Sequence, residues 1–394
     1  MLDLLLHADV FAPKPLGHRA VLIGGGRVLS ITEAPPQLAG VEVRTTDLEG
    51  RRLIPGLIDA HVHVTGGGGE AGPHTAAPSP ALTAYTRAGV TSVVGLLGTD
   101  DTTRTTGGLL RQVYALRAEG LSAWAWTGGY HLPPTTLTGS VRGDIAFVEP
   151  ILGFGELAIS DHRSSQPTAD ELARLAADCH VGGLMTGKAG VLHLHLGDGT
   201  RGLNLVRQLV ETTEIPPRTF HPTHVNRRSA LLDEAFALIG QGVTVDVTAF
   251  PPEFATSDEV LAADALVRAF DGGLAKHVTV SSDGGGCLPE FDRQGALVRM
   301  DFATSAAVAD LLADLLSRGV PLDQALPPFT CTPARLLRLR DKGEIAVGHD
   351  ADLVVLDADG RPSDVMARGR WHVRCGQPVV RGTFEPASAP SGAS

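Results

Sequence analysis

The chain has 394 residues, of which 43% are hydrophobic and 20% are charged, a composition typical of globular proteins. Its 44 acidic residues outnumber its 33 basic ones, and a formal net charge of -11 excludes a general binder of nucleic acid or of anionic membranes. The N-terminus lacks the basic region of a signal peptide, and no apolar run approaches the roughly 18 residues that span a bilayer. The four cysteines form no C-x-x-C pair. We therefore expect a cytoplasmic protein with reduced thiols.

Both ends of the chain have a β-type pattern. Residues 1–54 and residues 342–385 combine short apolar runs with glycine-containing turns. We expect these two segments to pair into one small β-sandwich domain. The small and polar residues 386–394 are predicted to form a disordered tail.

Between these ends, residues 55–341 alternate apolar, β-branched runs with segments of helical period, such as 172–180 and 229–242. The apolar runs number eight: 57–64, 91–97, 122–129, 151–159, 191–197, 218–224, 243–250 and 277–284. Eight strand–helix repeats predict an α/β protein with a (β/α)8 TIM barrel.

Residue types that bind metals close five of these eight runs: His61 and His63, Glu156, His195, His224, and Asp283. In a barrel of this kind the functional residues lie at the C-terminal ends of the strands. His61 and His63 are two residues apart, so both project from one face of a strand and can reach one metal. We interpret the set as a metal centre, although each histidine taken alone could be a satisfied core residue.

Four other histidines are interpreted as structural: His131, His162, His193 and His221. His193 shares a strand face with His195 but lies earlier in its strand, so it is expected deeper in the core. His221 is expected on the opposite face from His224, provided that the strand is regular.

Six segments resemble those of the isoaspartyl dipeptidases in the amidohydrolase superfamily: 59–73 (DAHVHVTGGGGEAGP), 89–100 (GVTSVVGLLGTD), 159–164 (ISDHRS), 222–227 (PTHVNR), 281–284 (SSDG) and 348–357 (GHDADLVVLD). The H-x-H pattern indicates only the superfamily, whereas GGGGEAGP together with DHRS is specific to this family. The resemblance covers essentially the whole chain. It implies a zinc-dependent hydrolase that cleaves the β-aspartyl bond of dipeptides and forms a homo-oligomer.

Carried over by motif, the resemblance implies two zinc ions per subunit. His61 and His63 would bind the more buried ion together with Asp283, and His195 and His224 would bind the second ion. A metal-bridging hydroxide would attack the peptide carbonyl. Asp283 would act as general base and then as general acid toward the leaving amine.

The resemblance also implies a set of substrate-binding positions: Gly68, Glu70, Thr99, Tyr130, Arg163, Arg227 and Cys287. The glutamate would pair with the free α-amino group, aided by backbone at the glycine and near the threonine. The two arginines would hold the α-carboxylate. The tyrosine would act in catalysis by donating a hydrogen bond to the developing oxyanion.

This chain departs from the family pattern at two positions. Glu156 stands where the family has a carboxylated lysine that bridges the two metals. Because glutamate is shorter, and because GFGE holds one residue more than the usual pattern, we hypothesise that the backbone is displaced toward the metals; a Glu156 that points away from the site would refute this. Cys287 stands where the family has serine, and a thiol is a weaker hydrogen-bond donor.

Two alternative functions follow from the same residues. A cyclic-amide or N-acyl amino-acid hydrolase could use the same scaffold, but its substrates have no free α-amine for Glu70. An inactive amidohydrolase-like assembly protein belongs to a different class. All six candidate ligand positions hold residues that can bind a metal, which argues against it.

Overall fold

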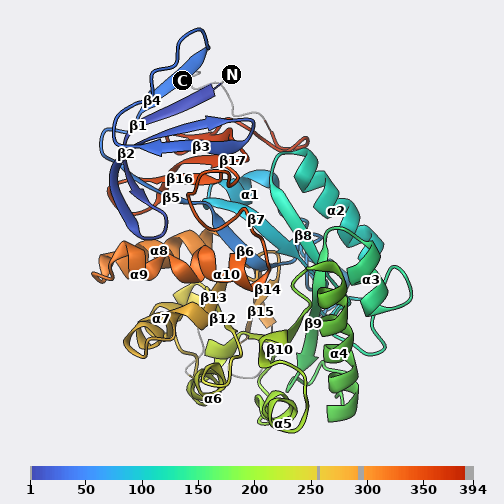
Figure 1. The fold of residues 1–394 in the computed structure, drawn as a ribbon. Coiled ribbons are helices and arrows are strands. Elements are labelled where there is room, and N and C mark those ends of the chain that lie inside the picture. Colours follow the sequence, from blue (N-terminus) through green and yellow to red (C-terminus); the bar gives the residue numbers. More distant parts are fainter. Residues whose placement is uncertain (1, 255–257, 292–296, 387–394) are drawn as a thin grey trace.

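The computed structural model describes residues 2–254, 258–291 and 297–386. The two chain ends meet in one sheet, and the middle of the chain forms parallel strands flanked by helices (Figure 1). The predicted tail, 386–394, lies outside the described residues except for its first residue.

The sheet made by the chain ends has nine described strands: β1 (Leu2–Phe11), β2 (Pro15–Gly24), β3 (Arg27–Thr32), β4 (Val43–Asp47), β5 (Arg52–Pro55), β16 (Leu353–Leu356), β17 (Pro362–Ala367), β18 (Arg370–Arg374) and β19 (Gln377–Pro378). Their order is β19-β18-β17-β16-β5-β1-β2-β3, and β4 pairs with β1. The antiparallel pairing of β16 with β5 joins the C-terminal segment to the N-terminal one, as expected.

The described ladders connect these strands into one continuous mixed sheet, whereas the sequence predicted a sandwich of two sheets. The difference arises because β5 pairs with both β1 and β16 and so connects the two groups of strands. Apolar residues from both groups, among them Leu5, Leu53 and Val355, still share one buried core.

The middle of the chain contributes eight parallel strands: β6 (Leu57–Val62), β7 (Val90–Gly95), β8 (Ser122–Thr127), β9 (Ile151–Ile159), β10 (Val191–Leu196), β11 (Phe220–Thr223), β12 (Val245–Thr248) and β13 (Val278–Ser281). Seven of them lie within a predicted run, and β7 begins one residue before the run 91–97. The first six form one sheet in chain order, and β12 pairs with β13. A parallel bridge between Val62 and Gly284 brings the end of β13 beside β6.

The described α-helices are α1 (Leu82–Thr86), α2 (Thr106–Ala118), α3 (Val141–Phe147), α4 (Ala169–Thr186), α5 (Asn204–Thr212), α6 (Ser229–Ile239), α7 (Ala262–Asp271), α8 (Ala306–Ser317), α9 (Leu322–Ala325) and α10 (Cys331–Leu336). Those between the parallel strands lie on their outer side (Figure 1). Both predicted helical segments are found, as α4 and α6. Helix α4 begins at a capping box formed by Thr168 and Glu171 and ends at Gly187, whose left-handed backbone suits glycine.

Shorter elements complete the described fold. The 3-10 helices cover Pro73–Thr75, Pro217–Thr219, Val225–Arg227, Pro252–Phe254, Ala275–His277 and Pro327–Phe329, and an antiparallel hairpin consists of β14 (Cys287–Phe291) and β15 (Leu297–Phe302). All four cysteines are free. Among the helices of the described residues, none has the length and apolar character required to cross a membrane.

Candidate active site

Six side chains converge at the C-terminal ends of the parallel strands, and they are the six predicted ligands: His61 and His63 at β6, Glu156 on β9, His195 on β10, His224 after β11 and Asp283 after β13. They form three overlapping groups in which the potential ligand atoms lie within 4.8 Å of one another. The ends of parallel strands share one edge, which is why residues far apart in the sequence meet here.

Glu156 lies at the centre of this cluster. Its Oε1 is 3.5 Å from Nε2 of His61 and 3.6 Å from Nε2 of His63. Its Oε2 is 3.0 Å from Nδ1 of His195 and 3.6 Å from Nε2 of His224. One carboxylate therefore faces two pairs of imidazoles with its two oxygens, an arrangement suited to bridging two cations.

A β-bulge brings Glu156 into this position. Leu192 and Leu194 of β10 are opposite Phe154 and Leu157 of β9, so three steps along β9 match two along β10. The bulge lies in the GFGE segment, and Glu156 points toward the histidines and not away from them. Gly155 permits the bulge, because a Cβ there would lie 2.7 Å from Cβ of His193.

The cluster fits a divalent metal. Buried atoms in it lack a hydrogen-bond partner, although buried polar atoms are usually paired: Nε2 of His61, Nδ1 of His63, Oε1 of Glu156, Nε2 of His224 and Oδ1 of Asp283. Burial alone raises the pKa of Glu156, but the facing His61 and His195 outweigh it and hold that pKa well below its usual range. Burial lowers the pKa of His224 to about 3. Burial lowers the pKa of His61 as well, but Glu156 and Asp283 outweigh it and raise that pKa. Zinc and similar ions bind anionic carboxylates and neutral imidazoles, so a bound metal would displace the proton of His61.

The structure corrects the predicted direction of His221. His224 has a left-handed backbone (φ 59°), so the alternation of the strand fails at its end and both side chains point inward. His221 is buried, and its Nδ1 lies 2.9 Å from Nδ1 of His193. His193 lies behind the cluster, as predicted, with its Nε2 2.8 Å from Nδ1 of His61.

Beside the cluster lies a group of charged side chains from the predicted substrate positions. Thr99 Oγ1 donates to Oε1 of Glu70 (2.9 Å), and the same oxygen is 3.2 Å from Nη1 of Arg163. The guanidinium carbon of Arg163 lies 5.4 Å from the ring centre of Tyr130. The structure thus brings together four residues that come from four separate strand ends.

Tyr130 is buried against the metal cluster. Its hydroxyl lies 2.8 Å from Nδ1 of His195. Burial and the charge of Glu156 raise the pKa of Tyr130, although Arg163 and Arg227 act in the opposite direction. The tyrosine therefore stays neutral and keeps a proton to donate. Arg227 itself lies 3.7 Å from the exposed carboxylate of Asp198.

Gly68 and Cys287 lie against each other at the edge of the site. Gly68 has a positive φ of 73°, and a Cβ there would lie 2.0 Å from Sγ of Cys287. The thiol donates to the carbonyl of Thr75 (3.3 Å), so in this structure it supports the glycine-rich loop. Burial raises the pKa of Cys287, which does not favour a nucleophilic thiolate.

Two further site residues were missed by the sequence analysis. Asp161 is buried and binds Arg163 through both carboxylate oxygens, at 3.0 and 2.8 Å, and also lies 3.0 Å from Nε2 of His195. Arg104 donates to Asp100 (2.9 Å) and to the carbonyl of Gly67 (3.3 Å). An acidic residue two positions after a predicted strand was the available signal for Asp161, whereas Arg104 carried none.

His131 fits its interpretation as a structural residue. The ring of His131 lies between Oδ1 of Asp101 (2.9 Å) and the carbonyl of Arg163 (3.1 Å), so it holds the arginine's loop. The side chain of His162 is exposed.

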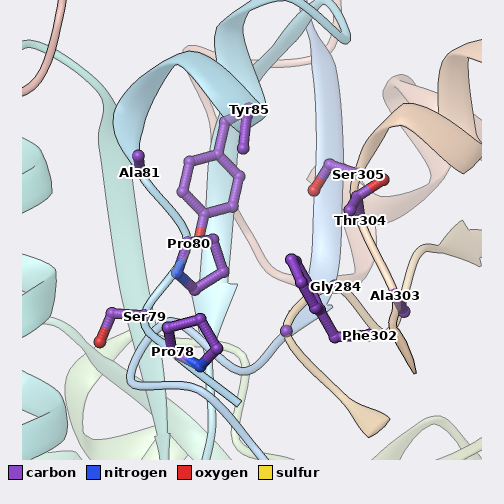
Figure 2. A pocket seen from close by; sticks show the side chains of 12 residues that line it. Pro78, Ser79, Pro80, Ala81, Tyr85, Gly284, Phe302, Ala303, Thr304 and Ser305 are labelled. Carbon is purple, nitrogen blue, oxygen red and sulfur yellow. The ribbon is translucent and has the colours of Figure 1, made fainter. Parts of the chain in front are cut away.

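A cavity of about 200 Å3 lies near this site, between the start of α1 and the segment after β15. Figure 2 shows the ring of Tyr85 on one side and Ser305 on the other, with Pro78 and Pro80 beside the ring. None of the predicted site residues lines the cavity, and its walls are mainly apolar. It is therefore a feature separate from the metal cluster.

Comparison with known proteins finds one matching family and several similar solved structures. Residues 52–372 match the amidohydrolase family. A beta-aspartyl dipeptidase from Fervidobacterium islandicum AW-1, solved in complex with beta-Asp-Leu dipeptide, is 40% identical over 96% of this chain and 98% of its own, with a TM-score of 0.88. A second structure of the beta-aspartyl dipeptidase from that organism is 37% identical over the same shares, with a TM-score of 0.89.

Two more distant similarities are consistent with these. A dihydropyrimidinase from Brevibacillus agri NCHU1002 is 17% identical over 97% of both chains, with a TM-score of 0.67, and shares the fold. An imidazolonepropionase from Methylobacterium sp. (strain 4-46) is 33% identical over 120 residues, which is 30% of either chain.

Proposed function

The chain belongs to the amidohydrolase family, and from this premise we propose that it hydrolyses the β-aspartyl peptide bond of dipeptides, such as β-Asp-Leu. The observation that carries the proposal is the pair formed by Glu70 and Arg163 beside the six candidate ligands. An isoaspartyl residue at the N-terminus has a free α-ammonium and a free α-carboxylate on one carbon. The pair offers an opposite charge to each.

The scaffold that we propose for this site is a closed (β/α)8 barrel with a small β domain made by residues 1–54 and 342–385. Closure between β13 and β6 is supported by the parallel bridge between Val62 and Gly284. In this bridge the backbone N–H of His63 donates to the carbonyl oxygen of Gly284 at 2.8 Å. Between β11 and β12, Thr223 Oγ1 donates to Asp246 at 2.8 Å.

The metal that we propose is zinc, with two ions per subunit bridged by Glu156. His61, His63 and Asp283 would hold one ion, and His195 and His224 the other; Asp283 and His63 already lie 3.0 Å apart. When bound, such ions supply Lewis-acid activation of water and of the scissile carbonyl. Four imidazoles and two carboxylates are the donor types that zinc prefers.

The protein side chains have separate tasks in this reaction. Glu70 accepts hydrogen bonds from the α-ammonium, and Arg163 and Arg227 bind the α-carboxylate. Tyr130 donates to the carbonyl oxygen as negative charge develops on it. Asp283 accepts the proton of the attacking water and delivers it to the leaving amine.

This charge pattern sets the selectivity. An N-acyl amino acid or a cyclic amide has no ammonium to pair with Glu70, and a charge left unpaired in a partly buried site is costly. Backbone near Gly68 and Thr99 is proposed to line the ammonium side, and Cys287 to support it. As in the family, we propose a homo-oligomer.

The test compares hydrolysis of β-Asp-Leu, α-Asp-Leu and succinyl-Leu by zinc-loaded protein. Succinyl-Leu is β-Asp-Leu without its α-amino group. We expect rapid turnover of β-Asp-Leu alone. Preference for succinyl-Leu would instead support an N-acyl amino-acid hydrolase, and no turnover by protein with bound zinc would favour an inactive relative.

A further inference from the structure

A continuous chain of polar side chains runs from the candidate metal site into the protein interior. Nδ1 of His61 is 2.8 Å from Nε2 of His193, whose Nδ1 is 2.9 Å from Nδ1 of His221. Nε2 of His221 is 2.9 Å from Thr279 Oγ1, which donates to Oδ1 of Asp246 at 2.6 Å. All five side chains are fully buried. We call this set the five-residue relay.

One backbone atom fixes where the protons lie. The carbonyl oxygen of His221 is 3.0 Å from Nδ1 of His193. A carbonyl can only accept, so Nδ1 of His193 must carry a proton. A neutral His193 then has a bare Nε2, which accepts from Nδ1–H of His61. The remaining nitrogen of His61, Nε2, faces Glu156 and Asp283, so it is the nitrogen that is available to a metal.

The other half of the relay follows from the same proton. Nδ1 of His221 faces the N–H of His193 and must accept, so His221 carries its proton on Nε2 and donates it to Thr279. The threonine hydroxyl in turn donates to Asp246. Every donor in the relay thus points toward the carboxylate, and the contacts require a proton on Nδ1 of His61, on Nδ1 of His193 and on Nε2 of His221.

Asp246 is suited to end such a chain. Its other oxygen, Oδ2, accepts from the hydroxyls of Thr223 (2.8 Å) and Ser281 (2.5 Å). In the described residues, the side-chain donors to this buried carboxylate are the three hydroxyls of Thr223, Thr279 and Ser281, with no lysine or arginine among them. The hydroxyls that donate to this carboxylate therefore stabilise its negative charge. One of them, on Thr279, belongs to the relay, and the relay ends at the candidate metal site.

We infer that Asp246 is a positioning residue for the metal centre: through Thr279, His221 and His193 it fixes the tautomer of His61 that presents the Nε2 lone pair to the metal. This inference rests on the proposed metal centre. Groups that hold the second nitrogen of a metal-binding histidine orient the ring and increase its basicity. Here that function is carried over four hydrogen bonds and not by a direct partner.

The test uses two substitutions of one residue. Thr279→Val removes the hydroxyl while keeping the shape of the side chain, and Thr279→Ser keeps the hydroxyl. The dissociation constant for Zn2+ is measured by competition with a chelator, and the unfolding free energy of the metal-free protein is measured in parallel. We expect Thr279→Val to weaken zinc binding about 10- to 100-fold, and Thr279→Ser to restore most of the affinity.

A purely structural network gives a different result. Thr279→Val would then reduce the stability of the metal-free protein but leave the affinity for zinc at the wild-type value, and this outcome would overturn the inference. Asp246→Asn is the second variant, should the valine protein not fold; its amide can donate to Thr279 and so permits the reversed relay. It is expected to weaken zinc binding to a similar degree.

Histidine tautomers provide a readout that needs no metal. In 15N-labelled metal-free protein, long-range 15N–1H correlations are expected to show His61 and His193 protonated on Nδ1 and His221 on Nε2. A wild-type protein that has these tautomers but binds no zinc would contradict the proposed metal centre alone. A His61 without a proton on Nδ1 would contradict the relay.

Discussion

Glu70 is the residue that most directly connects this structure to a choice of substrate. It is about one-third exposed, receives a hydrogen bond from Thr99 and pairs with Arg163. The arginine is itself held by Asp161 in a two-oxygen contact, so it keeps its direction when Glu70 turns to a substrate. The glutamate is therefore the movable partner, and its charge is available for an ammonium group.

Substitution of Glu70 by glutamine tests this assignment. We expect kcat/KM for β-Asp-Leu to fall at least about 30-fold, since removing one partner of a charged contact costs about 2 kcal/mol or more. For succinyl-Leu, which has no α-amino group, the same substitution should change kcat/KM little. Steady-state kinetics on both substrates give the comparison. An equal loss of kcat/KM on both substrates would show that Glu70 does not bind the ammonium group.

At the scale of elements, the bulge in β9 determines where the bridging carboxylate lies. Gly155→Ala places a Cβ 2.7 Å from Cβ of His193, which cannot move freely because it is in the five-residue relay. We expect a loss of about 1–3 kcal/mol in the unfolding free energy, typical of overpacking, together with weaker zinc binding. Chemical denaturation and chelator competition measure the two effects.

Gly107→Ala is the matched control for this substitution. Gly107 lies in α2, and a Cβ there meets nothing closer than 3.8 Å. Alanine should leave zinc binding unchanged and stabilise the protein by up to about 1 kcal/mol. If Gly155→Ala behaved like this control, the bulge would not constrain the position of Glu156.

Strand β18 contains a buried histidine, His372, whose contribution to the unfolding free energy depends on pH. Burial, aided by Arg370, lowers the pKa of His372 to about 4, and neither ring nitrogen has a partner. The unfolded state, with a pKa near 6.5, binds a proton first, so stability falls as the pH drops from about 6.5 to 4. Between pH 7.5 and pH 5 this single group should remove about 2 kcal/mol.

The measurement is the unfolding free energy of wild type and of His372→Phe at both pH values. Buried histidines elsewhere, such as His221 with a pKa of about 4, also lose stability in acid but do so in both proteins. The phenylalanine variant should therefore lose about 2 kcal/mol less than wild type. Equal losses would mean that His372 does not titrate in this range.

The elements also show what a sequence can and cannot predict. The eight parallel strands were predictable because each is a short apolar run, and the six converging residues because each lies at a strand end. The direction in which the His221 side chain points was not predictable, because it depends on the left-handed backbone at His224. Arg104 and Asp246 act through contacts with residues on other elements, and no local pattern indicates those contacts.

For the whole molecule, one buried lysine lies at the junction between the terminal sheet and the parallel strands. Nζ of Lys342 donates to Ser122 Oγ at the start of β8 (2.6 Å) and contacts Asp350 (2.8 Å) and Asp352 (2.5 Å) just before β16. Asp352 also accepts from the backbone N–H of Arg368 in the terminal sheet (2.7 Å). One cation thus links β8 to the strands of the chain ends.

Lys342→Met should therefore destabilise the whole protein. It keeps the length of the side chain but leaves the buried Asp352 without its cation, a change that typically costs about 3–5 kcal/mol. Lys276→Met is the control, because Lys276 is exposed and its loss should change the unfolding free energy by less than about 0.5 kcal/mol. Thermal and chemical unfolding of the two variants give the comparison.

Zinc binding provides a second measurement on Lys342→Met. Because Lys342 lies outside the metal cluster, this variant should still bind zinc with wild-type affinity at temperatures where it is folded. A loss of affinity there would show that the junction also determines the geometry of the site.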